Sequence, residues 1–156
     1  IPESEKSKKI DEIREKYFNK CFINIVEEPE LNLFPGSQWE MLKSLLKFNN
    51  LNDGNKLIMT THSPYIINYL SVVIQAGYLK DIPKSKTLDT KLNNIVPVES
   101  IVNAENVTIY QFDEISGSIS KLEKYDGIPS DKNYLNESLV EGNYLFDSLL
   151  EIEQEV

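Results

Sequence analysis

The chain has 156 residues, 40% hydrophobic and 26% charged, a balance that predicts one globular domain rather than a disordered segment. Its net charge of −9 should repel a phosphate backbone, so we do not expect this chain alone to bind nucleic acid directly. One cysteine excludes a disulfide scaffold and fits a cytoplasmic protein, and no apolar run approaches the roughly 20 residues that span a bilayer.

The first predicted element is a helix over residues 4–19, for which Ser4 is the expected N-cap. Its apolar residues recur at helical spacing near one face, and its charged residues should be solvated. The apolar residues are Ile10, Ile13, Tyr17 and Phe18.

A strand, a helix and a second strand follow. The apolar runs at residues 21–27 and 57–61 predict buried strands, and the leucine pattern of residues 38–48 predicts a helix between them. The repeat of about 35 residues from strand to strand is typical of a βαβ unit with parallel strands. Another helix is expected to open at Ser63–Pro64 and to end near Gln75.

The second half of the chain has a weaker pattern. Residues 80–97 are polar, contain two prolines and predict an exposed excursion. Residues 107–113 and 117–125 alternate and predict an antiparallel hairpin. Residues 135–152 predict an amphipathic helix or a pair of helices.

The residues that could perform chemistry follow the two buried strands. INIVEEPELNLFP spans residues 23–35, and LIMTTHSPYII spans residues 57–67. Ligands bind outside the carboxyl ends of strands in open α/β sheets, so we expect Glu27, Glu28 and His62 around one crevice.

These three side chains suit phosphate chemistry. One carboxylate beside a phosphate can hold Mg²⁺, a second can orient a water and take its proton, and a neutral histidine can hydrogen-bond a terminal phosphate oxygen. A glutamate pair at a strand end is also typical of a solvated loop, and THSP is also typical of a helix start capped by Ser63. The functional interpretation therefore depends on both motifs occurring together at βαβ spacing.

The two motifs resemble the Walker B/D-loop and H-loop segments of ABC-type ATPases, most closely the prokaryotic branch related to recombination, repair and overcoming-lysogenization-defect ATPases. The resemblance implies a three-layer α/β fold of the P-loop NTPase type, with ATP and Mg²⁺ as cofactors. It assigns Glu27 to Mg²⁺, Glu28 to the catalytic base and His62 to the switch histidine that contacts the nucleotide. It also makes residues 30–34 a D-loop that touches a partner subunit.

Other parts of such an ATPase are missing from the sequence. No glycine is followed by lysine, so the Walker A loop that cradles phosphates is absent, and the signature position near Ser4 reads ESEKS. The missing motifs, and a first residue that is Ile1 rather than methionine, favour a fragment that is inactive alone. We interpret residues 1–156 as a single partial domain, with the ATPase motifs in 1–79 and a hairpin and helix in 80–156. Its expected partner is a missing N-terminal ATPase lobe or a second copy.

Two alternatives remain open. The chain could be a degenerate ATPase-like module used for dimerisation or partner binding, which the missing Walker A loop favours. It could also be a metal-dependent nuclease that uses Glu27, Glu28 and Glu30. A Walker A sequence upstream would argue against the first, and absence of Mn²⁺-dependent DNA cleavage would argue against the second.

Overall fold

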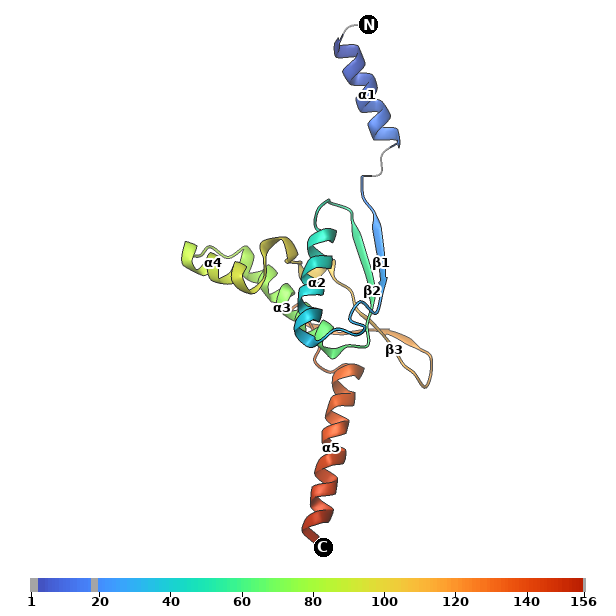
Figure 1. Ribbon diagram of the computed structural model, residues 1–156, viewed down its shortest axis with the longest axis vertical. Coiled ribbons are helices and arrows are strands. Elements are labelled where there is room, and N and C mark those ends of the chain that lie inside the picture. The colour runs from blue at the N-terminus through green and yellow to red at the C-terminus, as the bar shows by residue number, and fades with distance from the viewer. Residues whose placement is uncertain (1–2, 18–19, 156) are drawn as a thin grey trace.

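A parallel pair of strands and their connecting helix form the centre of the protein in the computed structural model, which describes residues 3–17 and 20–155 (Figure 1). Strand β1 (Ile23–Glu27) leads into helix α2 (Pro35–Asn49) and then into strand β2 (Lys56–Thr60). The strands pair in parallel, with Ile23 opposite Lys56 and Glu27 opposite Thr60. The predicted parallel βαβ unit is confirmed, and the fold is mixed α/β.

Only one face of this two-stranded sheet is covered. Val26 and Met59 face the helices and are half-buried, whereas the other face exposes 61% of Ile23, 68% of Ile25 and 51% of Ile58. The prediction of fully buried strands is therefore wrong for the chain as described. Parallel strands are normally covered on both faces, and within the described residues the helices that pack on the sheet lie on one side.

The core lies between α2 and helix α3 (Pro64–Lys80), which extends five residues beyond the predicted end at Gln75. Gly77 in this extension allows close packing, because a Cβ there would lie 2.5 Å from the backbone oxygen of Val102. The core side chains come from both helices and from the segment that follows them. They are Leu42, Leu46, Ile66, Leu70, Val73, Ile74, Ala76, Val96 and Ile101.

The exposed excursion contains a helix that the sequence reading missed. Helix α4 (Lys86–Ile95) has no buried residue, and the Ser85 side chain caps it by accepting a hydrogen bond from the Leu88 N–H. Single 3₁₀ turns follow at η1 (Val98–Ser100) and η2 (Ala104–Asn106). Most of the excursion is exposed as predicted, but Val96 near its end is buried in the core, and the helical spacing of Leu88, Leu92 and Ile95 was overlooked.

Two short antiparallel hairpins follow. Strands β3 (Tyr110–Phe112) and β4 (Ile119–Lys121) form the predicted hairpin, with shorter strands than expected. Strands β5 (Lys124–Tyr125) and β6 (Ile128–Pro129) form a second one, which was not predicted. Its turn has φ of 50° at Asp126 and 80° at Gly127, the combination that two-residue hairpin loops require.

Helices α1 (Glu3–Tyr17) and α5 (Tyr134–Glu155) project from opposite ends of this body (Figure 1). Ser4 lies inside α1 rather than at its cap, and Ile10 and Ile13 are each 51% exposed. Phe18 and the Tyr17 side chain, expected on the same face, lie outside the described residues. The tail is a single helix rather than a pair. Among the described helices, none is both long and apolar enough to cross a membrane.

Candidate functional site

Glu27 and Glu28 occupy the carboxyl end of β1. Glu27 is the last residue of the strand, and its side chain is exposed on the bare face of the sheet. The Glu28 N–H donates to the Thr60 carbonyl oxygen at 3.1 Å and to the Thr60 hydroxyl at 3.2 Å. Glu28 adopts a φ of 41°, an uncommon conformation for a residue with a side chain, so the backbone turns sharply at this point.

The turn brings Glu28 to His62, which follows the neighbouring strand. The Glu28 carboxylate oxygen Oε1 lies 3.5 Å from the imidazole Nε2 of His62. The side chains are 43% and 80% exposed, respectively, so a ligand can reach both. Two of the three residues that the sequence predicts around one crevice therefore approach each other across the ends of adjacent strands.

Glu30 holds the two loops together. Its buried Oε1 accepts hydrogen bonds from the Thr61 hydroxyl at 2.7 Å and from the His62 N–H at 2.8 Å. Bonds to an ionised carboxylate are stronger than bonds between neutral groups. Its other oxygen, Oε2, is buried without a partner among the described residues. The Glu30 carboxylate fixes the backbone from which His62 projects.

A second buried pair, Ser63 and Gln38, connects the same two loops to the start of α2. The Ser63 hydroxyl donates to Oε1 of Gln38 at 2.6 Å, and Gln38 Nε2 donates to the Leu33 carbonyl at 3.0 Å. Ser63 occupies the N-cap position of α3, but its side chain makes no capping bond, so the predicted capping role is wrong. Sequence reasoning missed Gln38; its signal was a polar residue one helical turn before the inward Leu42.

The loop of residues 30–34 presents apolar side chains to solvent. Leu31 N–H bonds to Glu28 O and Leu33 N–H bonds to Glu30 O, which gives two successive tight turns with a φ of 62° at Asn32. Leu31 is 65% exposed and Phe34 is 83% exposed. Exposed apolar side chains on an ordered loop are typical of a contact surface.

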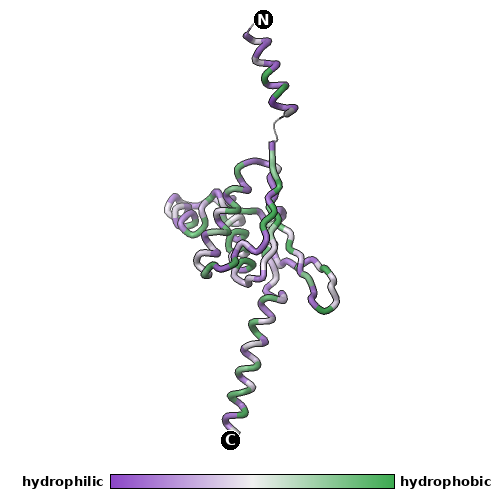
Figure 2. Tube along the Cα trace, turned by 45° about the vertical axis from the view of Figure 1, so that its right-hand side comes forward, coloured by the Kyte–Doolittle hydropathy of each residue, from purple (hydrophilic) through white to green (hydrophobic). Residues whose placement is uncertain are grey.

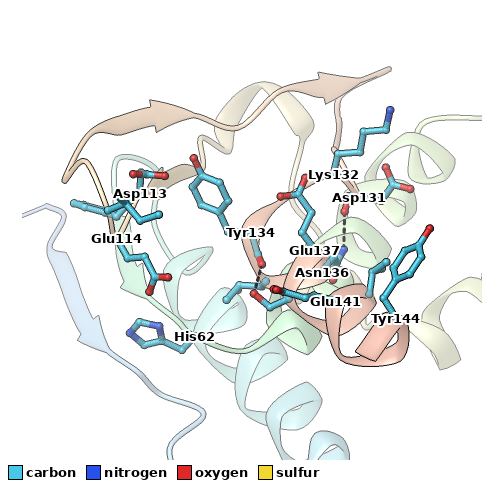
Figure 3. Close-up of a pocket in the computed structure, with 15 residues that line it drawn as sticks. His62, Asp113, Glu114, Asp131, Lys132, Tyr134, Asn136, Glu137, Glu141 and Tyr144 are labelled. Atoms are coloured by element: carbon cyan, nitrogen blue, oxygen red, sulfur yellow. Dashed lines mark hydrogen bonds between the residues drawn. The ribbon is translucent and has the colours of Figure 1, made fainter. Parts of the chain in front are cut away.

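An open groove of about 930 Å³ lies beside His62 and was not foreseen from the sequence (Figure 3). Its walls come from the β3–β4 turn and from the first turns of α5. Asp113 and Tyr134 both line it, and the charge of Asp113 raises the pKa of the Tyr134 phenol. Hydrogen bonds from the Ser116 hydroxyl and N–H lower the pKa of the Asp113 carboxyl.

The carboxylates suit a hard cation, but they do not form a complete cage. Among the described residues, no group of three or more His, Cys, Asp or Glu is arranged to hold a metal ion. Glu27 is exposed and Glu28 is partly exposed, whereas one Glu30 oxygen already accepts two hydrogen bonds. Mg²⁺ is usually bound by one or two carboxylates together with substrate phosphates, so the exposed Glu27 carboxylate fits a magnesium ion that arrives with a nucleotide.

A family model described as an AAA ATPase domain matches residues 3–67. The matched segment contains β1, α2, β2 and both loops that carry Glu28 and His62. The match supports an ATPase of the AAA and P-loop group, with nucleotide and Mg²⁺ as the general cofactors of such proteins. The comparisons with curated proteins and with solved structures give no match.

Proposed function

We propose that this chain supplies the water-activating and γ-phosphate-contacting part of an ABC-type ATP-hydrolysing site. The single observation that carries the proposal is the 3.5 Å approach of Glu28 Oε1 to His62 Nε2 across adjacent parallel strands. The family match to an ATPase domain covers both residues and agrees with this interpretation.

Each residue has a separate role in the proposal. Glu27 holds Mg²⁺ together with the nucleotide phosphates. Glu28 orients the attacking water and accepts its proton, and the His62 imidazole donates a hydrogen bond to the terminal phosphate. The hydrogen bonds from Thr61 and His62 to Glu30 keep the histidine in place before the nucleotide arrives. Magnesium supplies charge neutralisation at the phosphates when it is bound.

The remaining part of the site lies outside these 156 residues. The chain contains no Gly-rich phosphate loop, and a triphosphate needs backbone amides or cations that Glu27, Glu28 and His62 do not supply. The bare face of β1 and β2 fits an ATPase lobe that covers it with a second layer. The exposed Leu31 and Phe34 fit a second copy of the chain on the other side of the nucleotide. We assign these two surfaces to those two partners.

ATP turnover by this chain alone, and by an assembly that adds a Walker A lobe, tests the proposal. With Mg²⁺, the chain alone should release no phosphate above background, and the assembly should hydrolyse ATP. Assembly should bury the exposed apolar face of β1 and β2, on which Ile25 lies. Ile25→Glu places a charge on that face, so it should prevent assembly while leaving the fold of the chain intact. Hydrolysis by the isolated chain, or unchanged assembly of the Ile25→Glu variant, would contradict the proposal.

A degenerate module for dimerisation or docking is the second candidate. The missing phosphate loop and the exposed apolar D-loop favour it. Calorimetric titration with Mg·ATP distinguishes the two candidates. An ATPase part binds Mg·ATP once the Walker A lobe is present. A degenerate module binds its partner, and the complex binds no Mg·ATP.

A further inference from the structure

The charge of the chain is concentrated at its C-terminal end. Residues 113–156 contain eleven acidic and three basic residues, a net charge of −8. The preceding 112 residues contain fourteen acidic and thirteen basic residues, a net charge of −1. Nearly all of the −9 charge therefore lies in the β3–β4 turn, the second hairpin and α5.

Helix α5 has an apolar side and an acidic side, and both are exposed. At about 100° per residue, most of its large apolar residues fall on one half of the helix, although Glu153 interrupts that half near its end. These residues are Leu135, Leu139, Leu145, Phe146, Leu149, Leu150 and Ile152. The other half carries Glu137, Glu141, Asp147 and Glu151. The helix contains no lysine or arginine, and residues 137–154 are all exposed.

Figure 2 shows α5 leaving the body with apolar and polar residues alternating along its length. An uncovered apolar stripe of this size normally marks a binding surface. The helix points away from the sheet, so a partner on α5 and an ATPase lobe on the bare sheet face occupy different places (Figure 1).

The negative charge excludes several occupants. A second α5 packed on the apolar side would bring together the Glu153 carboxylates and the edges of two acidic halves with no cation to offset them, which is repulsive. An anionic membrane surface attracts helices rich in lysine and arginine, and a nucleic-acid backbone does the same. The occupant must bring positive charge together with apolar side chains.

We propose that α5, together with the groove at its start, docks an amphipathic helix of another protein whose leucine-rich face is edged by lysine and arginine. The groove extends the same chemistry, since Asp113, Glu114 and Asp131 add carboxylates and Phe112 and Tyr134 add aromatic rings. Aromatic faces and carboxylates together attract cationic side chains (Figure 3). His62 also lines the groove, but the proposal is independent of the ATPase assignment, because the binding is assigned to the α5 face and to the carboxylates and aromatic rings of the groove.

Two designed helical peptides of about 20 residues, one of leucine and lysine and one of leucine and glutamate, serve as probes. Fluorescence anisotropy with the whole chain should show binding of the lysine peptide only. Raising the salt from 50 to 200 mM should weaken that binding several-fold, because exposed charges are screened. Sedimentation of the chain without peptide should show a monomer.

Matched variants locate the binding. Leu145→Gln with Leu149→Gln removes exposed apolar side chains without changing charge and should weaken binding at least tenfold. Ile10→Gln with Ile13→Gln makes the same change on α1, where exposure is similar, and should leave binding unchanged. When Glu141, Asp147 and Glu151 are all changed to Lys, the chain should bind the glutamate peptide more tightly than the lysine peptide.

Circular dichroism establishes that each variant keeps its helices. Equal binding of both peptides, or equal loss of binding in the α1 and α5 variants, overturns the proposal. So does a dimer that Leu145→Gln with Leu149→Gln dissociates, since the occupant would then be a second copy.

Discussion

The buried carboxylate of Glu30 accepts a 2.8 Å hydrogen bond from the backbone N–H of His62, and so couples the loop after β1 to the loop after β2. The same oxygen accepts the Thr61 hydroxyl at 2.7 Å. The position of the histidine thus depends on a residue 32 positions earlier in the chain.

Replacing Glu30 with Ala tests this coupling. The change leaves the Thr61 hydroxyl and the His62 N–H without their acceptor, which should lower the free energy of unfolding by about 1–3 kcal/mol. His62 is the single histidine, so its imidazole NMR signals are unambiguous and should broaden or shift. The control is Glu40→Ala, which removes only an exposed bond to Lys43 and should change stability by less than about 0.5 kcal/mol. Equal effects of the two variants would refute the coupling.

The buried Ser63–Gln38 bond should also contribute to stability. Ser63→Ala leaves the Gln38 oxygen unpaired in the interior, so we expect a loss of about 1–3 kcal/mol in urea unfolding. Ser44→Ala is the matched control, because the Ser44 hydroxyl only returns to a carbonyl of its own helix on an exposed face. It should be close to neutral. A neutral Ser63→Ala would mean that water replaces the hydroxyl.

Two helical glycines should respond in opposite directions to alanine. A Cβ at Gly77 would lie 2.5 Å from the Val102 carbonyl oxygen, so Gly77→Ala should destabilise the protein by about 1–3 kcal/mol. A Cβ at Gly142 in α5 meets nothing within 4 Å. Gly142→Ala should therefore raise the helix content, with a gain of up to about 1 kcal/mol for α5. Thermal unfolding followed by circular dichroism separates the two, and destabilisation by Gly142→Ala would show that α5 packs closely against something.

The β3–β4 turn should be pH-sensitive at low pH. The Ser116 hydroxyl, then its N–H, lower the pKa of Asp113 in the folded state. A carboxyl with a lowered folded pKa stabilises the fold above its unfolded pKa of about 3.9, and this contribution is lost as the pH falls through the folded pKa. Carbon-detected NMR titration should place the Asp113 pKa below its ordinary range, and Ser116→Ala should raise it. An unchanged Asp113 titration in Ser116→Ala would contradict this cause.

The sequence predicts the strands and helices better than it predicts the side-chain contacts and burial around them. The parallel strands and the approach of Glu28 to His62 follow from strand patterns and βαβ spacing, which are local signals. The buried clamp by Glu30 and the partner role of Gln38 depend on side-chain packing between loops, which no spacing rule encodes. The predicted burial of Ile25 fails because burial depends on a layer that the described chain does not supply.

The same reasoning explains α4 and the second hairpin. Helix α4 does carry an apolar period, since Leu88, Leu92 and Ile95 recur at helical spacing, but its ten residues lie in a polar stretch between two prolines and were read as irregular. The strands β5 and β6 have two residues each, too few for alternation to be visible. Their signal was the Asp126–Gly127 pair, a typical hairpin turn.

The most direct test of the central claim is ATP turnover by the Walker A-containing assembly that carries Glu28→Gln. The assembly should keep its affinity for Mg·ATP and lose turnover by about 10²–10⁴-fold, the usual contribution of a general base. Glu40→Gln in the same assembly should turn over ATP normally. Normal turnover by Glu28→Gln would contradict the assignment of Glu28 and, with it, the proposed site.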